Sequence, residues 1–110
     1  YGFASRFEGK PVTNPEELLA AAHAGCFTMA LSLILGEAKL VAAQMDTSAK
    51  VTLEQVDGGY SITAVHLVLK AKIPDADDAT FQACAAKAKA NCPVSKLFNT
   101  NITLDASLVA

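Results

Sequence analysis

The stretch NPEELLAAAHAGCFTMALSLILG, residues 14–36, decides the fold. Asn14 can cap a helix and Pro15 suits the first helical position, while the two glutamates that follow favour the positive end of the helix dipole. Gly36 provides a natural stop. The segment therefore predicts one long helix that ends near Leu35.

Residues 18–35 of this helix carry no formal charge, which puts the run at the lower limit for crossing a bilayer. His23, Thr28 and Ser32 interrupt the run, and much of it is alanine and glycine. We therefore interpret it as a buried central helix rather than a membrane span. A helix that is apolar all round must be covered on every side, which a chain of 110 residues can barely achieve alone. The run thus also predicts a dimer.

The composition describes a single folded domain. A chain of 110 residues, 52% hydrophobic and only 18% charged, is long enough for one core and too apolar for disorder. The net charge of −2 and the pI near 5.6 leave no excess of basic residues, and the nine that exist are scattered. We expect neither nucleic acid nor membrane as a partner.

The rest of the chain predicts a hairpin, a second helix, a short helical turn and a last strand. β-Branched residues and a DGG turn signal indicate the hairpin, and Cys92-Pro93 opens the helical turn. The predicted elements are strands at 47–56 and 60–73, a turn at 57–59, a helix at 76–90, a helical turn at 92–98 and a strand at 101–109. This order predicts an α+β domain, with an antiparallel sheet packed on two helices.

Cys26 lies about three turns into the long helix, beyond the reach of the helix dipole. Burial among apolar side chains would raise the pKa of its thiol, so the helix alone predicts an inert thiol. A reactive Cys26 requires a cation from elsewhere in the fold.

Arg6 is the only arginine, and its guanidinium could fork onto a thiolate and a carboxylate, although it could equally be a solvated strand-end residue. Glu16 likewise needs no function beyond the dipole.

Cys92 precedes Pro93 at a helix start, where backbone N–H groups can stabilise a thiolate, so in isolation it is the more reactive thiol. Cys84 lies mid-helix between alanines and is interpreted as filler. Cys84 and Cys92 could not form a disulfide within one helix, because eight residues rise about 12 Å.

The odd number of cysteines and the lack of a signal peptide before Tyr1 predict a reducing cytoplasm.

His23 and Cys26 are three residues apart and share a helix face. Three interpretations stay open for the histidine: a Cys–His nucleophile pair, half of a zinc site, or a packed histidine with a hydrogen bond. Zinc needs further ligands, but the sequence contains neither CxxC nor HxxxH, and His66 is the only other histidine. We therefore expect neither a metal nor a cofactor.

NPEELLAAAHAGCFTMALS together with the later NCPVS strongly resembles the OsmC/Ohr family of thiol-dependent hydroperoxide reductases. The opening YGFASRFEG and the closing ITLDASL fit the OsmC branch, so the resemblance covers nearly the whole chain. Members of this family usually begin with further strands that pair within an interlocked dimer. We therefore expect residues 1–110 to form a single OsmC-like domain, an intertwined homodimer, that lacks those N-terminal strands.

The resemblance implies roles for four residues. Cys26 matches the peroxidatic cysteine and Cys92 the resolving cysteine of the CPVS motif. Arg6 matches the arginine that activates the thiolate, and Glu16 matches the glutamate that orients it. No role carries over to His23, and Cys84 matches no family motif.

The activity implied by the resemblance is a peroxidase that acts in oxidative and osmotic stress defence. It reduces organic hydroperoxides, and hydrogen peroxide less well, to alcohols through a Cys26 sulfenic acid and a Cys26–Cys92 disulfide. A dithiol reductant, which in this family resembles a lipoyl-bearing protein, regenerates the pair. The alternatives are a non-catalytic thiol redox sensor and a plain dimerisation module.

Arg6 must then serve both Glu16 and Cys26, although ten residues of straight helix amount to about 15 Å of rise. Either the helix breaks near Gly25, or Glu16 reaches the site from the second subunit of a dimer. We favour the dimer, because the apolar helix already requires a partner.

Overall fold

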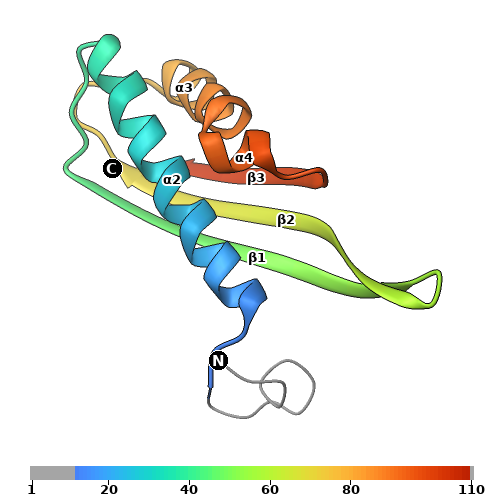
Figure 1. Cartoon of the computed structure of the whole chain (residues 1–110). Coiled ribbons are helices and arrows are strands. Elements are labelled where there is room, and N and C mark those ends of the chain that lie inside the picture. Colours follow the sequence, from blue (N-terminus) through green and yellow to red (C-terminus); the bar gives the residue numbers. More distant parts are fainter. Residues whose placement is uncertain (1–11, 110) are drawn as a thin grey trace.

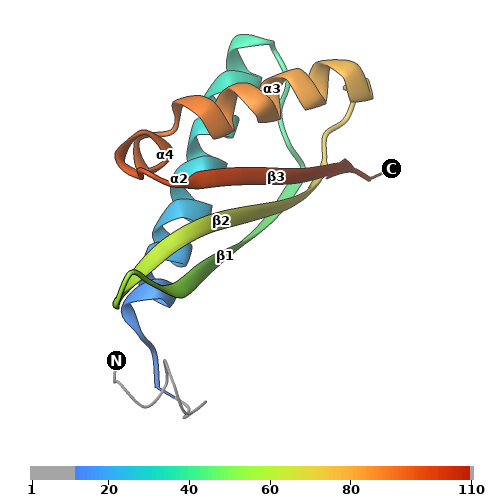
Figure 2. The same ribbon diagram turned by 90° about the vertical axis from the view of Figure 1, so that its right-hand side faces the viewer.

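The computed structural model describes residues 12–109, in which a three-stranded sheet carries helices on one face (Figures 1 and 2). The elements follow in the order α2 (Pro15–Glu37), β1 (Gln44–Val56), β2 (Gly59–Lys72), α3 (Asp78–Asn91), α4 (Pro93–Leu97) and β3 (Asn101–Leu108). This order confirms the predicted α+β architecture.

Helix α2 begins as the sequence predicts but ends later. The Asn14 side chain accepts a hydrogen bond from the Glu17 backbone N–H at 2.9 Å, which fixes the first turn. The predicted stop at Gly36 is wrong, because the helix continues through Glu37. The chain instead reverses at Lys39, which has a φ of 63°, and the Leu40 N–H bonds back to the Leu35 carbonyl at 2.8 Å. This 6→1 bond closes the helix in the manner of a Schellman motif.

The predicted hairpin is confirmed, with β1 and β2 antiparallel from Gln44↔Lys72 to Val56↔Gly59. Asp57 and Gly58 both have positive φ, 51° and 82°, as a two-residue type I′ turn requires.

The expectation of a wholly antiparallel sheet is wrong at β3, which pairs with β2 in parallel and places β2 in the centre. Helices α3 and α4 form the crossover between these two strands, and such a crossover returns the chain to the end of the sheet where β2 began. Figure 1 shows both helices between β2 and β3 along the chain.

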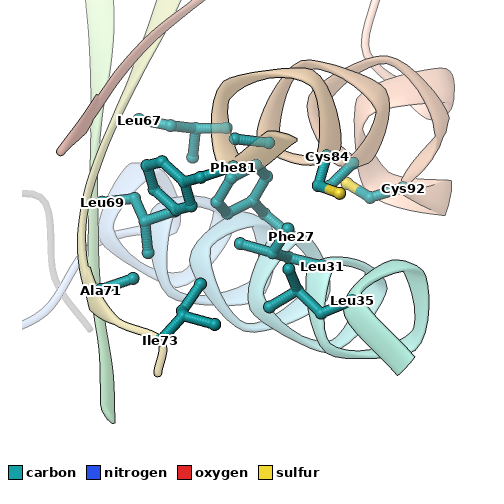
Figure 3. Close-up of a cluster of buried hydrophobic side chains, with 12 residues drawn as sticks. Phe27, Leu31, Leu35, Leu67, Leu69, Ala71, Ile73, Phe81, Cys84 and Cys92 are labelled. Carbon is teal, nitrogen blue, oxygen red and sulfur yellow. The ribbon is translucent and has the colours of Figure 1, made fainter. Parts of the chain in front are cut away.

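The core lies between the sheet and the two longer helices (Figure 3). Alternate residues of β2 face it, as the two-residue period of a strand requires. Helix α2 contributes every fourth residue, and α3 contributes one aromatic ring and small side chains. The buried cluster consists of Phe27, Leu31, Leu35, Leu67, Leu69, Ala71, Ile73, Phe81, Cys84, Ala85, Ala88 and Cys92.

Within residues 12–109 only one face of α2 is covered, as expected of a chain that can barely enclose this helix alone. Its buried residues are His23, Phe27, Leu31 and Leu35. On the opposite side Met29 is 75% exposed and Leu33 is 69% exposed. By length and composition alone α2 is also apolar enough to cross a membrane.

We expect Phe27→Ala to lower the free energy of unfolding by about 3–5 kcal/mol, because the ring is fully buried between α2 and the sheet and its loss leaves a cavity. Urea denaturation followed by circular dichroism measures the change. Ser32→Ala, at an exposed position of the same helix, is the control and should change stability by less than about 0.5 kcal/mol. Equal effects of the two substitutions would contradict the described core.

Candidate active site

Two of the three thiols meet where α4 packs against α2. Cys26 projects from the middle of α2, Cys92 is the N-cap residue of α4, and the Cys92 side chain is near enough to raise the pKa of the Cys26 thiol. A mechanism that joins two thiols in a disulfide needs them to lie close together.

The first turn of α4 directs a backbone N–H at each sulfur. The Ser95 N–H donates a hydrogen bond to Cys92 Sγ at 3.3 Å, and the Val94 N–H is near enough to Cys26 to lower the pKa of its thiol. The predicted cap position of Cys92 is therefore confirmed. A short helical turn beginning at Cys92 thus places a backbone N–H near both sulfurs.

The surroundings of Cys26 oppose its ionisation. Burial is the largest influence and raises the pKa of the Cys26 thiol, and the neighbouring Cys92 raises it further, while the Val94 N–H lowers it in part. The net direction is upward, as the sequence predicts. Arg6, the predicted activating cation, lies outside the described residues.

His23 contacts Cys92 indirectly, through a serine. His23 is fully buried, and its Nε2 lies 2.7 Å from Ser95 Oγ, which in turn lies 3.1 Å from Cys92 Sγ. Of the three interpretations of His23, the structure matches the hydrogen-bonded packed histidine. Ser95 was not predicted from the sequence, although a serine three residues after a capping cysteine is placed to meet that sulfur. In residues 12–109 no group of three or more His, Cys, Asp or Glu side chains could hold a metal ion.

An open apolar groove of about 800 Å³ runs beside Cys26. Aliphatic side chains of α2 form one wall, and the end of α3 with the start of α4 forms the other. The groove is lined by Gly25, Cys26, Met29, Ala30, Leu33, Ile34, Glu37, Lys87, Asn91 and Pro93. A small organic molecule could therefore reach the Cys26 thiol along an apolar surface.

Glu16 and Cys26 lie on one uninterrupted helix, so the alternative of a break near Gly25 is wrong. Glu16 is half-buried and lines a separate pocket of about 430 Å³ between the start of α2 and the β1–β2 hairpin. The neighbouring Glu17 accepts a hydrogen bond from the Thr13 hydroxyl at 3.1 Å and so serves the start of the helix. Within one chain the rise of α2 separates Glu16 from Cys26 by about 15 Å.

Cys84 lies in the core on α3 and is buried (Figure 3). Its position matches the interpretation as core filler.

Comparison with known proteins is consistent with this site. Residues 8–107 match the family model of the OsmC-like proteins. The peroxiredoxin OsmC of Escherichia coli K12 is 52% identical over 108 residues, which cover 98% of this chain and 76% of that protein. The organic hydroperoxide resistance protein of Xanthomonas axonopodis pv. citri is 32% identical, with coverage of 87% and 66%.

Solved structures show the same fold. The crystal structure of the organic hydroperoxide resistance protein OhrB of Bacillus subtilis superposes with a TM-score of 0.75 at 31% identity, covering 96% of this chain and 76% of that one. Sequence, fold and the paired thiols agree, and the chain belongs to the OsmC/Ohr family.

Proposed function

We propose that the protein is a thiol peroxidase that reduces organic hydroperoxides. The observation that carries the proposal is the contact between Cys26 and Cys92 at the first turn of α4. A peroxidase that works through a disulfide needs two thiols within reach, and relatives named for peroxiredoxin activity and organic hydroperoxide resistance support the same chemistry.

The groove beside Cys26 supports an organic substrate. Its walls are mostly aliphatic, so an alkyl or aryl group gains from leaving water there, whereas hydrogen peroxide has no apolar surface to bury. Preference for organic hydroperoxides therefore follows from the groove and agrees with the names of the relatives.

The proposed cycle has three steps. The Cys26 thiolate attacks the terminal peroxide oxygen, which releases the alcohol and leaves a sulfenic acid. The Cys92 sulfur then attacks Cys26 Sγ, so that an S–S bond forms, the S–O bond breaks and water leaves. An external dithiol, such as a lipoyl-bearing protein, reduces the disulfide by thiol exchange. The cycle requires no metal or cofactor and suits a reducing cytoplasm.

Arg6 is the proposed source of the cation that Cys26 lacks. Because burial raises the pKa of Cys26, the thiolate needs a nearby positive charge to form at neutral pH. Glu16 of a second subunit would orient this arginine, since α2 is unbroken and cannot bring its own Glu16 to Cys26. The exposed apolar side of α2 supports a homodimer.

We expect reduced protein treated with one equivalent of cumene hydroperoxide to lose two hydrogens, with Cys26 and Cys92 joined in the same peptide pair. Intact mass and fragment mapping measure this. Cys84→Ser is the matched control and should form the same disulfide, whereas Cys92→Ser should stop at the sulfenic acid and Cys26→Ser should not react. A Cys84 disulfide would contradict the assignment.

Turnover separates the peroxidase from a redox sensor. With excess dihydrolipoamide a peroxidase releases many equivalents of cumyl alcohol per chain, and a sensor releases one. Chromatography of the alcohol provides the count, and a single equivalent would overturn the proposed function.

We expect Arg6→Lys to lower the rate of sulfenic acid formation by about 10- to 100-fold although the charge is kept, because a lysine cannot replace a forked, charge-assisted contact. Stopped-flow measurement with cumene hydroperoxide gives the rate, and Arg6→Ala sets its lower limit. Wild-type rates in Arg6→Lys would exclude Arg6 as the activating group.

A site shared between subunits predicts complementation. Glu16→Ala and Cys26→Ser should each lose most activity, yet co-refolding them should restore about a quarter of the wild-type turnover, because half of the dimers are mixed and each mixed dimer holds one intact site. Gel filtration confirms the dimer. Absence of recovery in a verified mixed dimer, or full activity of a monomer, would contradict the shared site.

A further inference from the structure

His23 occupies an unusual position for a histidine. It is fully buried in α2, its ring meets Phe98 edge-on at a centroid distance of 5.2 Å, and its Nδ1 has no hydrogen-bond partner among residues 12–109. A buried polar atom left without a partner costs about 1–3 kcal/mol. An apolar residue would avoid this cost, so packing alone does not explain the imidazole.

The other ring nitrogen is connected to a reacting sulfur. His23 Nε2 lies 2.7 Å from Ser95 Oγ, and that hydroxyl lies 3.1 Å from Cys92 Sγ. Ser95 is itself buried, so water does not compete for the hydroxyl. Imidazole, hydroxyl and thiol thus form a continuous hydrogen-bonded chain that runs from α2 into the first turn of α4.

The hydrogen-bonded chain from His23 through Ser95 ends on Cys92, the thiol that must lose a proton in the second step of the cycle. Cys92 attacks the Cys26 sulfenic acid as a thiolate, since the thiolate is the nucleophile in disulfide formation. Burial lowers the pKa of His23, so the imidazole is neutral at neutral pH, and in the tautomer protonated at Nδ1 its Nε2 can accept a proton from Ser95.

We propose that Ser95 and His23 form a proton relay for the resolving cysteine, with Ser95 as a catalytic residue that touches the reacting sulfur and His23 as a positioning residue that acts through it. The inference rests on the proposed function, because it concerns the disulfide-forming step of that cycle.

In this step the Cys92 thiol gives its proton to Ser95 Oγ while the serine proton moves to His23 Nε2. The electron pair on Cys92 Sγ forms the S–S bond, and the Cys26 S–O bond breaks with release of hydroxide. The Cys92 sulfur is oxidised and the sulfenic sulfur is reduced. The imidazolium then passes this proton back through Ser95 to the hydroxide, which leaves as water, so protons and charge balance over the step.

The relay is tested by following the two chemical steps separately in the full-length chain. Reduced protein is mixed with one equivalent of cumene hydroperoxide and quenched over time. Gain of one oxygen marks sulfenic acid formation, and loss of two hydrogens marks the disulfide. The variants are Ser95→Ala, which keeps the backbone N–H to Cys92 Sγ, and His23→Gln, which keeps a hydrogen-bonding group but cannot carry the proton.

We expect both variants to gain oxygen at the wild-type rate and to form the disulfide about 100-fold more slowly. The double variant should be no slower than either single one, because the two residues act as a unit. Ser95→Thr, which retains the hydroxyl, should restore most of the rate. D2O should slow the second step in the wild type but not in Ser95→Ala.

The chain offers a matched control in its other histidine. His66 Nδ1 lies 2.6 Å from the Thr103 hydroxyl, in a pair that joins β2 to β3. His66→Gln removes the same type of hydrogen bond and should leave both steps unchanged.

Disulfide formation at the wild-type rate in Ser95→Ala and His23→Gln would overturn the relay while leaving the peroxidase function intact. Equal slowing of both steps, together with a lower unfolding temperature, would overturn it in favour of a structural role. Wild-type protein that gains no oxygen would instead overturn the peroxidase function on which the relay depends.

Discussion

Helix α2 carries apolar side chains all the way round, and the described chain can cover only one of its faces. Every fourth residue from His23 to Leu35 packs into the core, which fixes the rotation of the helix about its axis. That rotation brings Cys26 to the edge of the packed face, beside α4 and the apolar groove. The placement of the thiol is therefore a consequence of core packing, and the face that the described residues leave uncovered fits the proposed homodimer.

A thiol that reduces an organic hydroperoxide needs both an apolar surface for the substrate and a low pKa, and these two requirements conflict at Cys26. Burial beside an apolar groove provides a place for an organic group, but the same burial raises the pKa of Cys26. The Val94 backbone N–H of α4 offsets part of this penalty without adding a charge. The remainder must come from a cation, and the proposed source is Arg6.

The starts of the helices and the position of the hairpin could be predicted from the sequence. Asn14-Pro15 determines the start of α2, Asp57-Gly58 determines the hairpin, and Cys92-Pro93 determines the start of α4, because each depends on backbone preferences of adjacent residues. The resemblance to a family paired Cys26 with Cys92. The sequence did not predict the parallel pairing of β3, nor the contact of His23 with Ser95. Both depend on how the α3–α4 crossover returns to the sheet, and residues 72 positions apart carry no local signal for that.

The contact between α2 and α4 also couples oxidation to the rigidity of the fold. A covalent bond between Cys26 and Cys92 would close a loop of about 65 residues, which removes roughly 4 kcal/mol of chain entropy from the unfolded state. That loop encloses the hairpin, α3 and most of the core. The oxidised molecule would therefore resist heat and proteases better than the reduced one, so its thermal stability would itself report the redox state of the cell.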